Sequence, residues 1–78
     1  MNAAEVEKIL SRHGVHPRAY SIEGRNESDG QYRLEKSGTF WCVYYYERGN
    51  RSDARNFVEE KDACEWFIDL LLGDPATR

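Results

Sequence analysis

Hydrophobic residues recur at helical spacing near the N-terminal end of the chain. The apolar stripe there consists of Val6, Ile9, Leu10 and His13. Asn2 and Glu5 lie just before this stripe. Their three-residue spacing is that of a capping box, which marks the start of a helix. Gly14 and then Pro17 follow the stripe and stop the helix. The pattern therefore predicts one short amphipathic helix before residue 14.

A second helical stripe lies near the C-terminal end. It consists of Ala63, Cys64, Phe67, Ile68 and Leu71, widened by Trp66 and Leu70. This spacing predicts a helix over residues 60–72 with one buried face. Gly73 and Pro75 end that helix. We expect residues 1–73 to form one domain and residues 74–78 to be a mobile tail.

Between the helices the period changes to the two-residue alternation of strands. The predicted strands are residues 19–23, 31–36, 39–48 and 54–58. The polar, glycine-bounded segment 24–30 is a predicted loop, and Ser37-Gly38 a predicted turn. The order α-β-β-β-β-α predicts an α+β fold, with a curved antiparallel four-stranded sheet and two flanking helices.

The strand predicted at residues 39–48 has two apolar faces. One face carries Trp41, Val43 and Tyr45, and the other carries Phe40, Cys42, Tyr44 and Tyr46. If both helices cover the first face, the second is left open and suited to a partner. If one helix covers each face, both are simply core. The pattern leaves these two alternatives open.

Composition narrows the function classes. The chain has 78 residues, a formal net charge of -3 and an aromatic content of 13%, which argues against disorder. An acidic domain is a poor match for a protein that holds nucleic acid through its phosphates. The residues that could still serve nucleic acid are Tyr44, Tyr46, Arg48, Arg51 and Arg55. Glu47 and Asp53 interrupt that set, so ion pairing across a hairpin is the favoured interpretation.

Catalytic and metal-binding patterns are weak. His13 and His16 are separated by helix-breaking residues and have no nearby third ligand. Cys64 falls on a buried stripe and Cys42 within a strand, where each acts as a small hydrophobic residue. We therefore expect a protein that is not an enzyme and uses no metal or cofactor. With no signal-peptide pattern and two free thiols, we expect a cytoplasmic location and no membrane association.

Three segments resemble a known family. They are YSIEG at 20–24, YRLEK at 32–36 and WCVYYYERG at 41–49. Together with Phe57 and the later Ala63-Cys64-Glu65, they resemble a small bacterial immunity-protein family, number fifty-nine among those of polymorphic toxin systems. The family's usual Ser or Asp cap before the last helix is missing at 58–61. The resemblance implies a cytosolic protein that binds and neutralises a cognate toxin domain.

The predicted site is a protein-binding surface. Its candidate residues are Phe40, Tyr44, Tyr46, Glu35, Glu47, Arg48 and Arg51. Two alternatives remain. One is a small nucleic-acid-binding or regulatory module, and the other is a homodimeric structural domain that pairs through the aromatic face or an edge strand.

Overall fold

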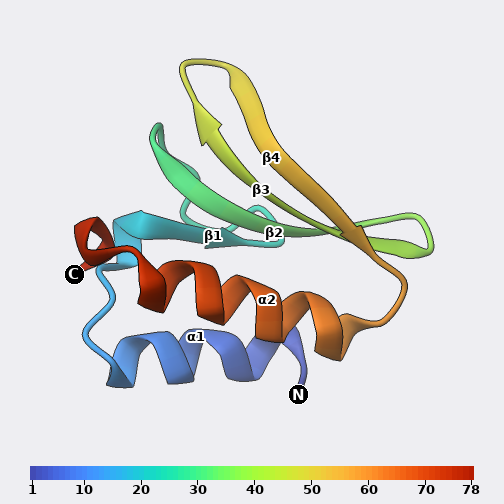
Figure 1. Ribbon diagram of the computed structural model, residues 1–78, viewed down its shortest axis with the longest axis horizontal. Helices are drawn as coiled ribbons and strands as arrows, with labels where there is room; N and C mark the ends of the chain where they lie inside the picture. The colour runs from blue at the N-terminus through green and yellow to red at the C-terminus, as the bar shows by residue number, and fades with distance from the viewer.

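The computed structural model describes residues 1–78, and two helices lie on one side of a four-stranded sheet (Figure 1). The helices are α1 (Ala3–Arg12) and α2 (Glu60–Gly73). The strands are β1 (Tyr20–Ile22), β2 (Gln31–Ser37), β3 (Phe40–Glu47) and β4 (Asn50–Phe57), in that spatial order. Short 3₁₀ turns η1 (Pro17–Ala19) and η2 (Pro75–Thr77) complete the chain. The predicted α+β class and element order are confirmed. Neither helix has the length and apolar character needed to cross a membrane.

The start of α1 is fixed by a side-chain cap, whereas the start of α2, at Glu59, has no side-chain cap. In α1 the predicted capping box is present, because Asn2 Oδ1 accepts from the Glu5 amide at 3.0 Å and Glu5 Oε1 accepts from the Asn2 amide at 3.1 Å. Glu60 at the start of α2 reaches across and accepts from the Ala3 amide at 2.8 Å. The two helix N-termini are therefore tied together, and the helices run side by side in Figure 1.

The core lies between the sheet and α2. Leu34, Trp41 and Val43 contribute from the sheet, and Phe67 and Leu71 from α2; all are buried. α2 packs on β2, β3 and β4, while α1 packs along α2. Each such side chain contributes about 1.5–3 kcal/mol when removed from water. Both helices thus lie on the Trp41 side of the sheet, with α2 against it and α1 beyond α2, and the opposite face has no helix on it (Figure 1).

One strand pair differs from the predicted antiparallel sheet. β1 runs parallel to β2, with Tyr20 opposite Tyr32 and Ile22 opposite Leu34, while β2, β3 and β4 pair antiparallel. A parallel pair ordinarily needs a long crossover. Because β1 has only three residues, the chain has to return by just about 10 Å, and the loop at residues 23–30 is enough. Glu23 begins this return with a φ of 51°.

The last strand starts earlier than predicted. β4 begins at Asn50, directly after a two-residue turn in which Arg48 and Gly49 both have positive φ, as a type I′ turn requires. Between the pairs Val43–Arg55 and Tyr45–Ser52 the register shifts by one residue. The extra residue makes a β-bulge in β4. As a result, two β4 residues an even number of positions apart, one on each side of the bulge, face opposite sides of the sheet.

The C-terminal residues, expected to be a mobile tail, are packed against the domain. Thr77 is buried, and its Oγ1 donates to the carbonyls of Leu71 and Asp74, each at 2.8 Å. The His16 amide donates to the Thr77 carbonyl at 2.7 Å. The Thr77 hydroxyl thus adds a side-chain contact to two carbonyl groups that also accept from the backbone amides of Asp74 and Thr77.

Candidate partner-binding surface

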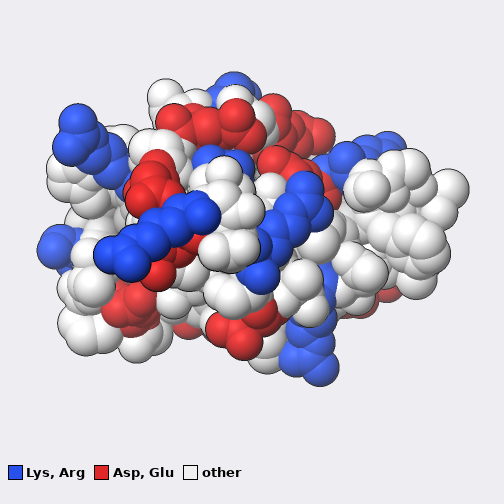
Figure 2. Space-filling model, turned by 90° about the horizontal axis from the view of Figure 1, so that it is seen from above, with Lys and Arg blue, Asp and Glu red and all other residues white.

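The sheet face without helices is called the open face below. Alternate residues of each strand point to this face, and the strand register brings them together there. They are Arg33, Glu35, Phe40, Cys42, Tyr44, Tyr46 and Arg51. Figure 2 views the molecule from this side and shows acidic and basic side chains interspersed over it. An uncharged area occupies the right-hand end of that view, where the β2–β3 turn lies in Figure 1.

Tyr44 and Tyr46 are not free aromatic rings. The Arg51 guanidinium lies over the Tyr44 ring, 4.4 Å from its centroid, and the Arg33 guanidinium lies 3.8 Å from the Tyr46 centroid. Tyr44 is only 2% exposed, and burial, followed by a hydrogen bond with Glu35, raises the pKa of its hydroxyl. Tyr44, one of the candidate contact residues, therefore lies buried with the Arg51 guanidinium over its ring. Stacking of this kind contributes about 0.5–2 kcal/mol per pair and fixes the cation in place.

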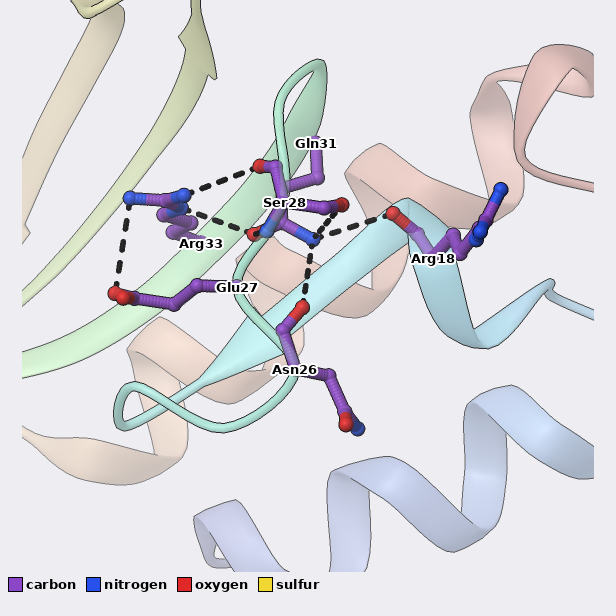
Figure 3. A network of polar contacts seen from close by, with 6 residues as sticks. All are labelled: Arg18, Asn26, Glu27, Ser28, Gln31 and Arg33. Atoms are coloured by element: carbon purple, nitrogen blue, oxygen red, sulfur yellow. Dashed lines mark hydrogen bonds and ion pairs between the residues drawn. The ribbon is translucent and has the colours of Figure 1, made fainter.

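Gln31 anchors the loop that returns from β1 to β2 (Figure 3). Its side chain is fully buried, and Nε2 lies 3.2 Å from the carbonyl oxygens of Arg18 and Asn26 and from Ser28 Oγ. Its Oε1 accepts from the Ser28 amide at 2.8 Å. One amide side chain therefore satisfies backbone groups of η1 and of the loop at the same time.

Arg33 extends this network onto the open face. Its Nε donates to Gln31 Oε1 at 3.0 Å, and its Nη2 donates to the Ser28 carbonyl at 3.1 Å. Glu27 lies 3.7 Å from Nη1 and completes the set drawn in Figure 3. With these partners and Tyr46 around it, the guanidinium is held in one position. Neither Gln31 nor Arg33 was among the site residues predicted from the sequence. Two long polar side chains within a strand beside a turn-rich loop could have indicated such a polar network.

The remaining predicted site residues separate into two places. Phe40 and the half-buried Glu35 belong to the open face, together with Arg51. Glu47 and Arg48 lie exposed at the β3–β4 turn instead. The Arg48 backbone amide donates to Asp29 Oδ1 at 2.6 Å, which ties that turn to the return loop.

An apolar pair lies at one end of the open face. Phe40 is 49% exposed and Val58 is 75% exposed. Since Trp41 pairs with Phe57, Phe40 and Val58 occupy the next position of the same ladder, where β4 has just ended. Val58, expected to lie in the last strand, follows the end of β4 and is a second exposed apolar side chain. We call Phe40 and Val58 the apolar pair.

The two thiols are poor nucleophiles. Burial raises the pKa of Cys64 to about 11, and burial is also the main cause of the raised pKa of Cys42. Both are therefore protonated near neutral pH, where the reactive thiolate form is scarce. No three His, Cys, Asp or Glu side chains come together in a metal-binding arrangement.

Comparison of the chain with protein-family models, curated proteins and solved structures finds no match. What the protein does is therefore inferred from its own surface.

Proposed function

We propose that this protein is a non-enzymatic binding module that holds a protein partner on the open face, anchored by the apolar pair. Following the resemblance of the 41–49 segment, the proposed partner is a bacterial toxin domain that the protein neutralises in the cytoplasm. The observation that carries the proposal is the exposure of Phe40 and Val58 beside a face of fixed arginines.

The physical case rests on how little the face must reorganise. Aromatic residues and arginine are the residue types enriched in the centres of protein interfaces. Immobilising a free, rotamer-rich side chain costs about 0.5–1.5 kcal/mol on binding. Arg33 and Arg51 are already held on tyrosine rings, so this cost is reduced before a partner arrives. Because Phe40 is 49% exposed, burying the rest of its side chain would contribute about 0.7–1.5 kcal/mol, half the value for a fully exposed ring.

The nucleic-acid alternative is less well supported by the arrangement. Arg55 lies over Trp66 on the helix side, not with Arg51 on the open face. Arg33 is paired with Glu27, and a net charge of -3 opposes phosphate binding. A protein partner with basic groups agrees better with this charge.

The test is to look for a toxin domain encoded next to the gene and to co-express it with this protein; the absence of such a domain would contradict the proposed partner. Native protein is expected to protect the cells, and Phe40→Asp is expected to lose protection because it places a charge in the contact. Ser11→Asp, on exposed α1, is the matched control and should protect like native protein. Equal protection by both variants, with both folded, would show that the apolar pair is not the contact.

A further inference from the structure

A cavity of about 270 Å³ lies on the helix side of the sheet, beside the β4 bulge. Its walls come from the sheet and from α2. They consist of Tyr32, Tyr45, Asp53, Trp66 and Leu70, and Tyr44, whose ring lies under Arg51 on the open face, also borders the cavity. Neither the open face nor the apolar pair accounts for it.

The cavity is walled mainly by aromatic rings. Tyr32 and Tyr45 meet edge to face, with centroids 4.9 Å apart and an interplanar angle of 70°. Trp66 contributes from α2, and the guanidinium of Arg55 lies 4.3 Å from its ring centroid. The faces of such rings are negative and attract cations. Trp66 therefore already holds one cation on its ring, although Arg55 is not among the residues that line the cavity.

Carboxylates add to the negative potential. Asp53 is part of the wall, and Asp74 accepts a hydrogen bond from the Tyr32 hydroxyl at 3.0 Å. Burial first, then Asp74, and to a lesser degree Asp53, raise the pKa of Tyr32 to about 12. Both carboxylates therefore act on the same hydroxyl, and Asp74 has the larger effect of the two.

We propose that this cavity receives the cationic side chain, lysine or arginine, of a protein partner. Three aromatic rings would surround the charged end, Asp53 would neutralise it, and Leu70 would contact its aliphatic stem. The assignment of the cation to a protein rests on the proposed function, whereas the cavity's preference for cations does not. Residues 50–56 of β4 are exposed along its edge, so a partner lying over that strand can reach the cavity.

The bulge is what places Asp53 at this wall. Asp53 has a φ of 54°, in the left-handed region that only glycine, asparagine and aspartate visit readily. Asp53→Asn is therefore expected to keep both the bulge and the shape of the cavity while removing the charge. Glu7→Gln, on exposed α1, removes the same charge elsewhere and is the matched control.

The experiment titrates n-butylammonium into the purified protein and follows the Trp66 indole N–H by NMR. We expect saturable millimolar binding in native protein and Glu7→Gln, at least threefold weaker binding in Asp53→Asn, and no comparable shift with n-butanol. Binding in Arg55→Gln should be no weaker than native, because Arg55 does not line the cavity and its positive charge opposes a second cation near Trp66. Equal binding by Asp53→Asn and native protein, or weaker binding in Arg55→Gln, would overturn the proposal.

Two further experiments are needed. One distinguishes a side-chain cation from a free quaternary amine, and the other distinguishes failure of this inference from failure of the proposed function. Tetramethylammonium that binds more tightly than n-butylammonium would point to a free quaternary amine and contradict the side-chain assignment. With the toxin domain, Asp53→Asn should weaken the complex and Glu7→Gln should not. If the domain does not bind native protein at all, the proposed function fails while ammonium binding still reports on the cavity. If it binds Asp53→Asn and native protein equally, only this inference fails.

Discussion

Replacing Gln31 by alanine tests how the return loop is held to the sheet. The change removes a fully buried amide that joins η1, the loop and Arg33. The Ser28 amide and the Arg33 Nε lose their acceptor, and the carbonyl oxygens of Arg18 and Asn26 lose their donor. β1 then has less to hold it in its parallel position beside β2.

The magnitude follows from those groups. A buried polar group left without a partner costs about 1–3 kcal/mol, and water entering from the loop side relieves part of this cost. We expect a total loss of about 3 kcal/mol. The whole domain has a stability of about 4–12 kcal/mol at this length. Since 1 kcal/mol corresponds to about 4–8 °C in a domain of this size, the midpoint should fall by about 12–24 °C.

The assay is urea and thermal unfolding followed by circular dichroism. Asn56→Ala removes an amide from the exposed strand β4 and is the control, with an expected change within about 0.5 kcal/mol. If Gln31→Ala lost less than about 1 kcal/mol, the network would not be what holds the loop, and the reasoning would be refuted.

Three other outcomes follow from the structure. Thr77→Val should lose about 1–2 kcal/mol in urea unfolding, because the buried hydroxyl no longer bonds to the Leu71 and Asp74 carbonyls; an unchanged stability would mean that the tail is not docked. In native protein at pH 8, iodoacetamide should alkylate Cys42 well before Cys64, and unfolding in urea should abolish the difference. Stability should fall as the pH rises from about 10 through about 12, because the unfolded tyrosine ionises first while the folded pKa of Tyr32 is about 12. Tyr32→Phe should make that fall shallower in denaturation series, and an identical slope would contradict the raised pKa.

The periodic elements could be predicted because their signals are local. The α1 capping box, the α2 stripe and the alternation around Trp41 each depend on neighbouring residues, and all three appear as predicted. Which sheet face the helices occupy did not follow from the sequence, because both faces of β3 are apolar; in the structure the core contains Trp41 and Val43.

The features that failed depend on long-range or single-residue events. The bulge at Asp53 reverses the alternation within β4, so Arg51 and Arg55 face opposite sides despite their even spacing. Tyr44 is buried beneath Arg51 from the neighbouring strand. The alternation of β4 treats Arg51 as a solvent-facing residue, so it gave no sign of this contact. The parallel direction of β1 is possible because the chain needs only a short loop to return to the start of β2. No local sequence pattern indicates the direction in which a strand pairs.

The most direct test of the proposed binding role is calorimetric titration of the purified toxin domain into this protein and into Phe40→Asp. The account predicts saturable one-to-one binding to native protein and affinity at least about 100-fold lower for Phe40→Asp, equivalent to about 2.7 kcal/mol. Ser11→Asp should bind like native protein. Undiminished binding by a folded Phe40→Asp would contradict the assignment of the open face and its apolar pair as the contact surface.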